Sequence, residues 1–401
     1  MLNAYIYDGL RSPIGRHGGV LASIRPDDLA AEVIKKLIEK TGVPGTDIED
    51  VILGDTNQAG EDSRNVARMA VLLAGLPVTV PGQTVNRLCA SGLGAIIDSA
   101  RAITCGEGEL YIAGGVESMT RAPFVMGKAE TAFSREAKIF DTTIGSRFPN
   151  KKITAQYGGH SMPETGDNVA VEFGVTREQA DTFAAQSQAK YQQAKTEGFF
   201  EGEITPIEVS QGKKLPPKLV SEDEHPRPSS NFEALSKLKP LFEGGVVTAG
   251  NASGINDGAA ALLIGSETVQ EKYGLKPMAK ILSAAAAGIE PRIMGAGPIE
   301  AIKKAVSRAG LTLDDMDIIE INEAFASQVL SCLKGLDVDF NDPRVNPNGG
   351  AIAVGHPLGA SGARLTLTVA RELQRRQKKY AVISLCIGVG QGLAMVIENV
   401  S

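Results

Sequence analysis

The sequence predicts an α/β protein made of two duplicated halves, with a long segment inserted into the first. A helix-like pattern at residues 32–43 recurs at 300–311, an offset of 268 residues. An Ala-Ser-Gly step followed by Ala-Arg recurs in the same way, at 90–101 and 360–371, an offset of 270 residues. Matches at nearly one offset indicate internal duplication. Strands that alternate with helices imply right-handed crossovers and a mostly parallel sheet in each half, covered by helices.

Each copy of the repeat supplies a helix and then a strand. The two helices are amphipathic and close at Gly42 and Gly310, because glycine is the usual residue just past a helix C-terminus. Each helix leads through an acidic turn into an apolar strand. The strands that we predict along the chain span residues 1–7, 50–53, 110–113, 259–264, 317–321 and 380–383.

The segment from about residue 119 to 248 has no counterpart in the second half, which indicates an insertion or lid. It contains a helix-like stretch at 176–196 and a polar, proline-rich stretch at 215–230. The strand at 259–264 is expected to return to the first sheet, and the alanine run at 284–287 to form a helix or a buried strand. The predicted parts are an N-terminal half, an insertion or loop domain and a C-terminal half, which span residues 1–118 plus 249–268, 119–248 and 269–401.

Length and composition limit the classes of function. A chain of 401 residues is long enough for two or three domains, and 43% hydrophobic residues support large cores. A net charge of −6 without a basic cluster argues against a nucleic-acid partner. The first residues carry no basic and apolar leader, and no apolar stretch approaches the ~20 residues that span a bilayer. We therefore expect a cytoplasmic protein without a membrane partner.

Three reactive side chains lie in glycine-bearing loops: Cys89, His356 and Cys386. Cys with His supplies an activated nucleophile and its base, and a second Cys adds a proton carrier. In the repeat Cys89 corresponds to Gly359, and each directly precedes Ala-Ser-Gly at the start of a helix. At such a helix start, backbone amides and the helix dipole favour a thiolate. If the halves pack about a pseudo-twofold axis, the loop that carries His356 meets the loop that carries Cys89. This combination suits carbon–sulfur and carbon–carbon chemistry on thioesters.

Each of these residues also has a purely structural interpretation. An isolated Cys89 is more often a buried small apolar residue, and a lone His356 is structural by default, although glycine and proline flank it. Cys105 and Cys332 lie in helix-like stretches without such loops, and we interpret both as packing residues. Four cysteines in so long a chain indicate reduced thiols rather than a disulfide framework.

Asn322 follows the predicted strand at 317–321, and its role stays open from spacing alone. Its amide can cap the following helix, or it can hold a water or an oxyanion. The glycine run at 388–392 lacks the Gly-x-Gly-x-x-Gly spacing of a dinucleotide fingerprint. No cluster of His, Cys and acidic residues has ligand spacing, so we predict no metal site.

These motifs together resemble the thiolase family, over essentially the whole chain. The resemblance implies a five-layered α-β-α-β-α fold of two similar halves with an inserted loop or lid domain, assembled as a homodimer or homotetramer. It also implies an acyltransferase that takes acyl-CoA substrates, uses coenzyme A as a co-substrate and holds no cofactor permanently. The segments that carry the resemblance are 86–92, 114–119, 248–254, 322–325, 355–359 and 386–388.

The resemblance implies a role for each matching residue. Cys89 is acylated, His356 is the base that activates it, and Cys386 exchanges a proton at the α-carbon of the acetyl unit. Asn322 holds a water that stabilises the enolate oxygen together with His356. The amides of Cys89 and Gly388 form the hole for the tetrahedral intermediate. The implied coenzyme A contacts are Met162, Arg227, Phe242, Ala249, Ser253 and Phe325.

Within the family, further stretches are most similar to bacterial members that cleave 3-oxoadipyl-CoA with coenzyme A to succinyl-CoA and acetyl-CoA, in the β-ketoadipate pathway of aromatic catabolism. The alternative is a broad-range 3-ketoacyl-CoA thiolase or acetyl-CoA C-acetyltransferase. Ser146 stands where that subgroup typically has Trp and Ala360 where it has Met, so the acyl pocket is wider or the preference altered. Ser161 stands where acetoacetyl-type members have His, which leaves its role open. The supporting stretches are 57–62, 65–70, 121–128, 141–145, 346–351 and 387–392.

Two relatives of other function share parts of this pattern. A condensing enzyme of the ketosynthase type also uses an activated Cys on a duplicated fold, but its triad runs Cys, His, then His or Asn. Here Asn322 precedes His356 and a second Cys ends the set, which favours a thiolase. A non-catalytic lipid carrier would keep the fold but lack one of the three reactive residues, whereas Cys89, His356 and Cys386 are all present here.

The distal carboxylate of a 3-oxoadipyl group requires a partner, because burying it unpaired is costly. We expect a cationic or hydrogen-bonding side chain near the far end of the acyl pocket. The candidates are Arg121, Lys128, Arg147 and the turn at 16–19.

Overall fold

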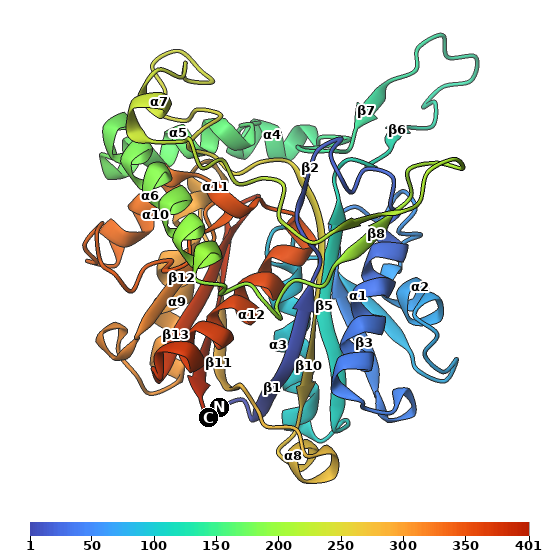
Figure 1. Cartoon of the computed structure of the whole chain (residues 1–401). Coiled ribbons are helices and arrows are strands. Elements are labelled where there is room, and N and C mark those ends of the chain that lie inside the picture. The colour runs from blue at the N-terminus through green and yellow to red at the C-terminus, as the bar shows by residue number, and fades with distance from the viewer. Residues whose placement is uncertain (401) are drawn as a thin grey trace.

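One continuous set of hydrogen-bonded strands runs through the protein in the computed structural model, which describes residues 1–400 (Figure 1). Its ten strands are β1 (Ala4–Arg11), β2 (Gly15–Arg16), β3 (Asp50–Gly54), β4 (Gly82–Val85), β5 (Leu110–Ser118), β10 (Asn256–Gly265), β11 (Ala279–Gly288), β12 (Ile318–Ile321), β13 (Tyr380–Ile387) and β14 (Gln391–Asn399). They lie in the order β12-β13-β14-β11-β1-β10-β5-β3-β4, and β2 pairs with β10.

This strand order divides into two halves of the same pattern. In the first half β3 is parallel to β5, and β10 is antiparallel to both β5 and β1. In the second half β12 is parallel to β13, and β14 is antiparallel to both β13 and β11. The strand pairing also shifts register at the equivalent place in each half. The shift lies between Ile6 and Asp8 of β1 and between Ile281 and Ser283 of β11. The predicted duplication is confirmed.

The expectation of mostly parallel sheets is wrong, because among the paired strands of residues 1–400 only β3–β4, β3–β5 and β12–β13 are parallel. Strands β13 and β14 are joined by the three residues 388–390, and so short a turn connects only antiparallel strands. The equivalent strands of the first half, β5 and β10, are also antiparallel. The long insertion therefore stands where the second half has its short turn.

Helices cover both halves and also separate them. The helices of the two halves are α1 (Pro26–Thr41), α2 (Val66–Leu73), α3 (Ser91–Cys105), α8 (Thr268–Tyr273), α9 (Gly297–Arg308), α10 (Ala326–Gly335), α11 (Ala351–Val354) and α12 (Leu358–Arg376), with 3₁₀ turns η1 (Gly45–Asp47), η2 (Pro291–Ala296) and η3 (Leu313–Asp315). Helices α1 and α2 pack on the outer face of the first half, and α9 and α10 on that of the second. Helices α3 and α12 lie between the two halves. This arrangement is the predicted five-layered α-β-α-β-α fold (Figure 1).

Glycines let the starts of α3 and α12 approach each other closely. A Cβ atom on Gly92 would lie 2.5 Å from the carbonyl oxygen of Gly359, and one on Gly362 would lie 2.2 Å from the backbone nitrogen of Leu93. Only a residue without a side chain permits such backbone contact. The loops that precede the two helices, which carry Cys89 and His356, are thereby drawn to one edge of the central layer.

The insertion covers this same edge, at the top of Figure 1, and a hairpin arm projects from it at the upper right. Its elements are β6 (Phe124–Met126), β7 (Ile139–Asp141), α4 (Lys151–Tyr157), α5 (Met162–Phe173), α6 (Arg177–Thr196), β8 (Ile207–Val209), β9 (Lys218–Val220) and α7 (Phe232–Ser236). Helix α6 follows the prediction, because Thr176 caps it and Gln179 completes a capping box. The alanine run at 284–287 lies in the buried strand β11. The three domain boundaries remain a prediction.

Helix α3 corrects two expectations. The stretch Leu88–Cys105 is long and apolar enough to span a bilayer by length and composition, although we expected no such stretch. Its helix supplies residues to the core between the two half-sheets, which accounts for the apolar composition. Cys105 at the end of α3 is exposed, so its interpretation as a packing residue is wrong, whereas Cys332 in α10 is buried.

Candidate active site

Cys89 lies in a tight turn between β4 and α3. The side chain of Asn86 accepts a hydrogen bond from the Leu88 amide at 2.8 Å. The Ser91 hydroxyl accepts one from the Arg87 amide, also at 2.8 Å. Leu88 has a φ of 47°, a left-handed conformation that is uncommon for a residue other than glycine. The turn is therefore held on both sides of the cysteine, whose side chain is buried.

The thiol of Cys89 is protonated in the resting protein. Burial raises the pKa of Cys89 to about 11, while hydrogen bonds from the backbone of Gly388 and of Cys89 itself act in the opposite direction. The backbone amides therefore favour the thiolate, as expected from the helix start, but loss of solvation outweighs them and the thiol stays protonated. A base has to remove this proton before the sulfur can attack.

His356 lies between α11 and α12, with both ring nitrogens engaged. Its Nδ1 is 2.6 Å from the hydroxyl of Ser361, and that hydroxyl donates to the carbonyl of Pro357 at 2.8 Å. Since the single hydroxyl proton is used there, Nδ1 carries the ring proton and donates it to Ser361. The lone pair is then on Nε2, 3.3 Å from the amide nitrogen of Asn322.

The imidazole of His356 is neutral at physiological pH. Burial lowers the pKa of His356 to about 3, and the nearby Arg364 guanidinium lowers it further. A neutral ring with its lone pair on Nε2 can accept a proton. The pair of a protonated thiol and a neutral imidazole is the starting state for nucleophile activation by a general base.

Asn322 directs its side chain towards His356. Its backbone amide donates to the Ser384 carbonyl at 2.9 Å, which fixes the end of β12 against β13. Helix α10 begins after Phe325, and no side-chain hydrogen bond caps it. Among the described residues, no donor lies within hydrogen-bonding distance of the buried Oδ1 atom of Asn322. An acceptor of this kind can hold a water molecule.

Cys386 lies near the end of β13 and is 1% exposed. It packs with Val247 and Phe325, and Met162 lies against this cluster. Burial raises the pKa of Cys386 well above its usual value, and the charge of an ionised Cys89 would raise it further. The two thiols are therefore close enough to interact, and Cys386 is a neutral proton donor when Cys89 is charged.

Gly388 approaches Cys89 from the turn between β13 and β14. A Cβ atom on Gly388 would lie 3.3 Å from Leu88 Cδ1 and 4.0 Å from Met162 Sδ. Its backbone hydrogen bond to the Cys89 thiol places an amide donor beside the reacting sulfur. With the amide of Cys89, it offers the pair of donors that an oxyanion hole needs.

The residues predicted to contact coenzyme A divide into two groups. Met162 and Phe325 pack with the cluster around Cys386, and the Ser253 amide donates to the Ala324 carbonyl of that cluster at 2.9 Å. The other three, Arg227, Phe242 and Ala249, are exposed. Their roles remain predictions. Ser161, whose role was open, precedes α5, and its amide donates to Glu164 at 2.6 Å.

Two positioning residues were missed from the sequence. In the sequence Ser361 marks only the duplication. Its spacing of five residues from His356, across a helix start, also indicates that its hydroxyl can reach the imidazole ring. Asn256 accepts a hydrogen bond from the His356 amide at 2.9 Å and donates to the Gly15 carbonyl at 2.9 Å. Nothing in the sequence links Asn256 to His356, because 100 residues separate them.

Asn256 in turn contacts His225, whose Nδ1 lies 3.3 Å from the Asn256 amide nitrogen. Burial lowers the pKa of His225 to about 4 from its ordinary 6.5, helped by Arg227 and Arg16 and opposed by Asp223 and Glu224. Between these two pH values the unfolded chain binds a proton that the folded protein does not. The contribution of a neutral His225 to the free energy of unfolding is therefore complete above pH 6.5 and is lost as the pH falls towards 4.

We expect His225→Asn to make the free energy of unfolding depend less on pH below neutrality. The amide oxygen of the new side chain replaces Nδ1 as a hydrogen-bond acceptor but does not titrate. The free energy of unfolding in urea, measured between about pH 7 and about pH 5, should fall less steeply by up to about 1.4 kcal/mol per pH unit. His17→Asn, at an exposed position, controls for the loss of a histidine. Parallel curves for wild type and His225→Asn would contradict the prediction.

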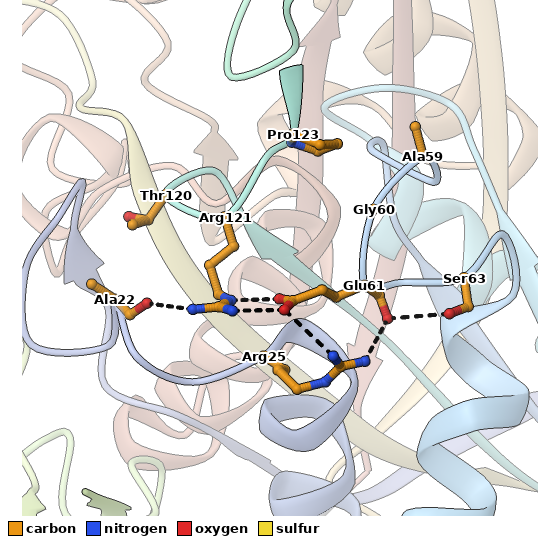
Figure 2. A pocket seen from close by; sticks show the side chains of 9 residues that line it. All are labelled: Ala22, Arg25, Ala59, Gly60, Glu61, Ser63, Thr120, Arg121 and Pro123. Carbon is orange, nitrogen blue, oxygen red and sulfur yellow. Dashed lines mark hydrogen bonds and ion pairs between the residues drawn. The ribbon is translucent and has the colours of Figure 1, made fainter. Parts of the chain in front are cut away.

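Arg121, a candidate partner for a distal carboxylate, is already engaged. Figure 2 shows Arg121 and Arg25 both directed at Glu61 in a pocket lined also by Thr120 and Pro123. The Arg121 Nη2 atom lies 2.6 Å from the Glu61 carboxylate, and its Nη1 donates to the Ala22 carbonyl at 3.2 Å. This ion pair ties the start of the insertion to the loop after β3. Lys128 is exposed and Arg147 half-buried.

No group of three or more His, Cys, Asp or Glu side chains within residues 1–400 is arranged to hold a metal ion. The candidate site consists instead of two thiols, an imidazole, an amide side chain and backbone donors. These groups suit proton transfer and acyl transfer.

Domain comparisons identify the family. The thiolase N-terminal domain matches residues 4–268, and the thiolase C-terminal domain matches residues 275–399. The chain therefore belongs to the thiolase family and is an acyltransferase. The structure is also similar to that of human mitochondrial 3-ketoacyl-CoA thiolase in complex with CoA, with a TM-score of 0.91 and 38% identity, covering 100% of this chain and 98% of that one.

Curated relatives are similar over their whole length. The chain is 55% identical over 404 residues to the 3-oxoadipyl-CoA/3-oxo-5,6-dehydrosuberyl-CoA thiolase of Escherichia coli, covering 100% of both. It is 56% identical over 402 residues to a beta-ketoadipyl-CoA thiolase of Acinetobacter baylyi, again covering 100% of both.

Proposed function

We propose that this protein cleaves 3-oxoadipyl-CoA with coenzyme A to succinyl-CoA and acetyl-CoA, through an acyl group on Cys89. The observation that carries the chemistry is the arrangement of two interacting buried thiols with a neutral His356 and the amide of Gly388. The choice of substrate is supported by the names of the relatives at 55% and 56% identity.

In the first step, His356 accepts the Cys89 proton at Nε2, and the sulfur attacks the 3-oxo carbon of the substrate. The amides of Cys89 and Gly388 stabilise the oxyanion of the tetrahedral intermediate. The bond between C2 and C3 then breaks and leaves its electron pair on C2. Asn322, through a water that it shares with His356, stabilises the enolate oxygen. Cys386 donates a proton to C2, and acetyl-CoA leaves.

In the second step, coenzyme A takes the succinyl group from Cys89. Its thiol loses a proton to the base that Cys386 has become, and its sulfur attacks the thioester carbonyl. The same two amides hold the second tetrahedral intermediate. Cys89 leaves as a thiolate and recovers its proton from His356. Separating carbon–carbon cleavage from the attack by coenzyme A in this way gives two easier steps.

Coenzyme A acts here as a co-substrate rather than a resident cofactor. Met162, Arg227, Phe242, Ala249, Ser253 and Phe325 are the proposed contacts. We also propose a cytoplasmic enzyme that assembles as a homodimer or homotetramer and has no nucleic-acid or membrane partner.

The substrate assignment is tested with a matched pair of substrates. 3-Oxoadipyl-CoA and 3-oxohexanoyl-CoA have equally long acyl chains, and only the first ends in a carboxylate. We expect kcat/KM for 3-oxoadipyl-CoA to be higher by about ten-fold, which corresponds to ~1.4 kcal/mol of differential transition-state binding. Equal or better use of the uncharged analogue would favour a broad-range 3-ketoacyl-CoA thiolase or acetyl-CoA C-acetyltransferase instead.

A further inference from the structure

Val389 occupies a backbone conformation that its side chain disfavours. It is the middle residue of the turn at 388–390 and has a φ of 64°. A positive φ is a genuine outlier for a β-branched residue, and glycine is the usual residue at such a position. The side chain of Val389 is 63% exposed. Packing within the chain therefore does little to offset the strain.

The neighbours of Val389 hold it in this conformation. The chain closes β13 onto β14 with Ile387 opposite Gln391, so only three residues make the turn. The carbonyl of Gly390 accepts a hydrogen bond from the Ile289 amide at 2.8 Å. A Cβ atom on Gly390 would lie 2.2 Å from the Ile289 carbonyl oxygen, so the turn is pressed against the chain after β11. Its shape is set by these contacts.

Val389 lies next to the residue that borders Cys89 in the candidate active site. Its neighbour Gly388 donates to the Cys89 thiol, and adjacent Cα atoms lie about 3.8 Å apart. Leu88, the other residue with a positive φ at this site, and Met162 approach Gly388 from two other segments. Val389 thus carries an exposed apolar side chain on the residue that directly follows the amide donor to the Cys89 thiol. Strained residues that persist at such places usually serve the site.

We propose that Val389 is a specificity-determining residue, whose side chain contacts the methylene carbons of the acyl group carried by Cys89. This inference rests on the proposed acyl transfer to Cys89. An acetyl group has no methylene, whereas butyryl and succinyl groups have two. Val389 therefore favours substrates that leave a longer acyl group on Cys89 and has little effect on acetoacetyl-CoA, which leaves acetyl.

The test compares thiolysis of acetoacetyl-CoA, 3-oxohexanoyl-CoA and 3-oxoadipyl-CoA by wild type, Val389→Gly and Val389→Ala. For both variants we expect kcat/KM for the two longer substrates to fall about ten-fold relative to acetoacetyl-CoA, the scale of one or two methylenes in an apolar site. The rate of succinyl transfer to Cys89 should fall in the same proportion, as followed by intact-protein mass spectrometry. Val389→Gly should also melt no lower than wild type, because glycine accepts the left-handed backbone.

Gln377→Gly is the matched control. Gln377 is another exposed residue with a left-handed backbone, φ 52°, but it lies at the end of α12, remote from Cys89. Its replacement should raise the melting temperature and leave the substrate ratios unchanged. Equal losses on all three substrates, or unchanged ratios in both Val389 variants, would overturn the proposal. A changed oligomeric mass with unchanged ratios would instead assign Val389 to a contact between subunits. The wild-type preference between 3-oxoadipyl-CoA and 3-oxohexanoyl-CoA tests the proposed function separately.

Discussion

Cys386→Ser is expected to separate the two chemical tasks of the site. The variant should still accept an acetyl group from acetyl-CoA on Cys89, because acylation depends on His356. It should exchange the α-protons of acetyl-CoA at least about 100-fold more slowly, the usual scale for a lost general acid or base. Burial already raises the pKa of the Cys386 thiol well above its usual value, and a serine hydroxyl in the same place is a still poorer acid and base.

Deuterium exchange into acetyl-CoA, followed by mass spectrometry, measures the loss. Intact-protein mass measured in parallel reports acetylation of Cys89. Cys105→Ser is the matched control, since Cys105 is an exposed thiol at the far end of α3. It should behave as wild type in both assays. Normal exchange in Cys386→Ser would exclude Cys386 as the proton carrier, and its role would then have to be structural.

The layered fold was predictable because duplication is visible as repeated local patterns. The matching steps at 90–101 and 360–371 correspond to α3 and α12, and their shared glycines explain why the two helices meet in the central layer. The direction of the strands was not predictable in this way. It depends on the turn at 388–390 and on the insertion that replaces this turn in the first half. Neither follows from helix and strand periodicity.

The candidate site was predictable where chemistry is concentrated in loops, and not where it depends on burial or on distant partners. The sequence indicates Cys89 and His356 as reactive residues, but the pKa of Cys89 is decided by solvation, which a helix-start argument ignores. The tautomer of His356 depends on where Ser361 sends its one hydroxyl proton. Arg121 looks like a free cation in the sequence, yet it pairs with Glu61, 60 residues earlier.

His356→Ala is expected to slow acylation of Cys89 by roughly 10² to 10⁴, the range attributed to a positioned general base. The reason lies in the resting state of the pair. With a pKa of about 11, raised by burial, the Cys89 thiol is almost wholly protonated at neutral pH. Burial lowers the pKa of His356, so the imidazole is neutral and its Nε2 lone pair is available to accept that proton as the sulfur attacks. Without it, the reaction depends on the small fraction of thiolate.

This difference in mechanism gives the variant a distinct pH dependence. Acetyl incorporation at Cys89, measured by intact-protein mass spectrometry, should rise about ten-fold per pH unit in His356→Ala, because the thiolate fraction grows in that proportion below the thiol pKa. Wild type should depend on pH much less steeply. Ser361→Ala keeps the base but releases the Nδ1 proton from its fixed acceptor, so its rate should lie between the two. Acylation of His356→Ala at the wild-type rate, or acetyl recovered on Cys332 rather than Cys89, would contradict the assignment of nucleophile and base.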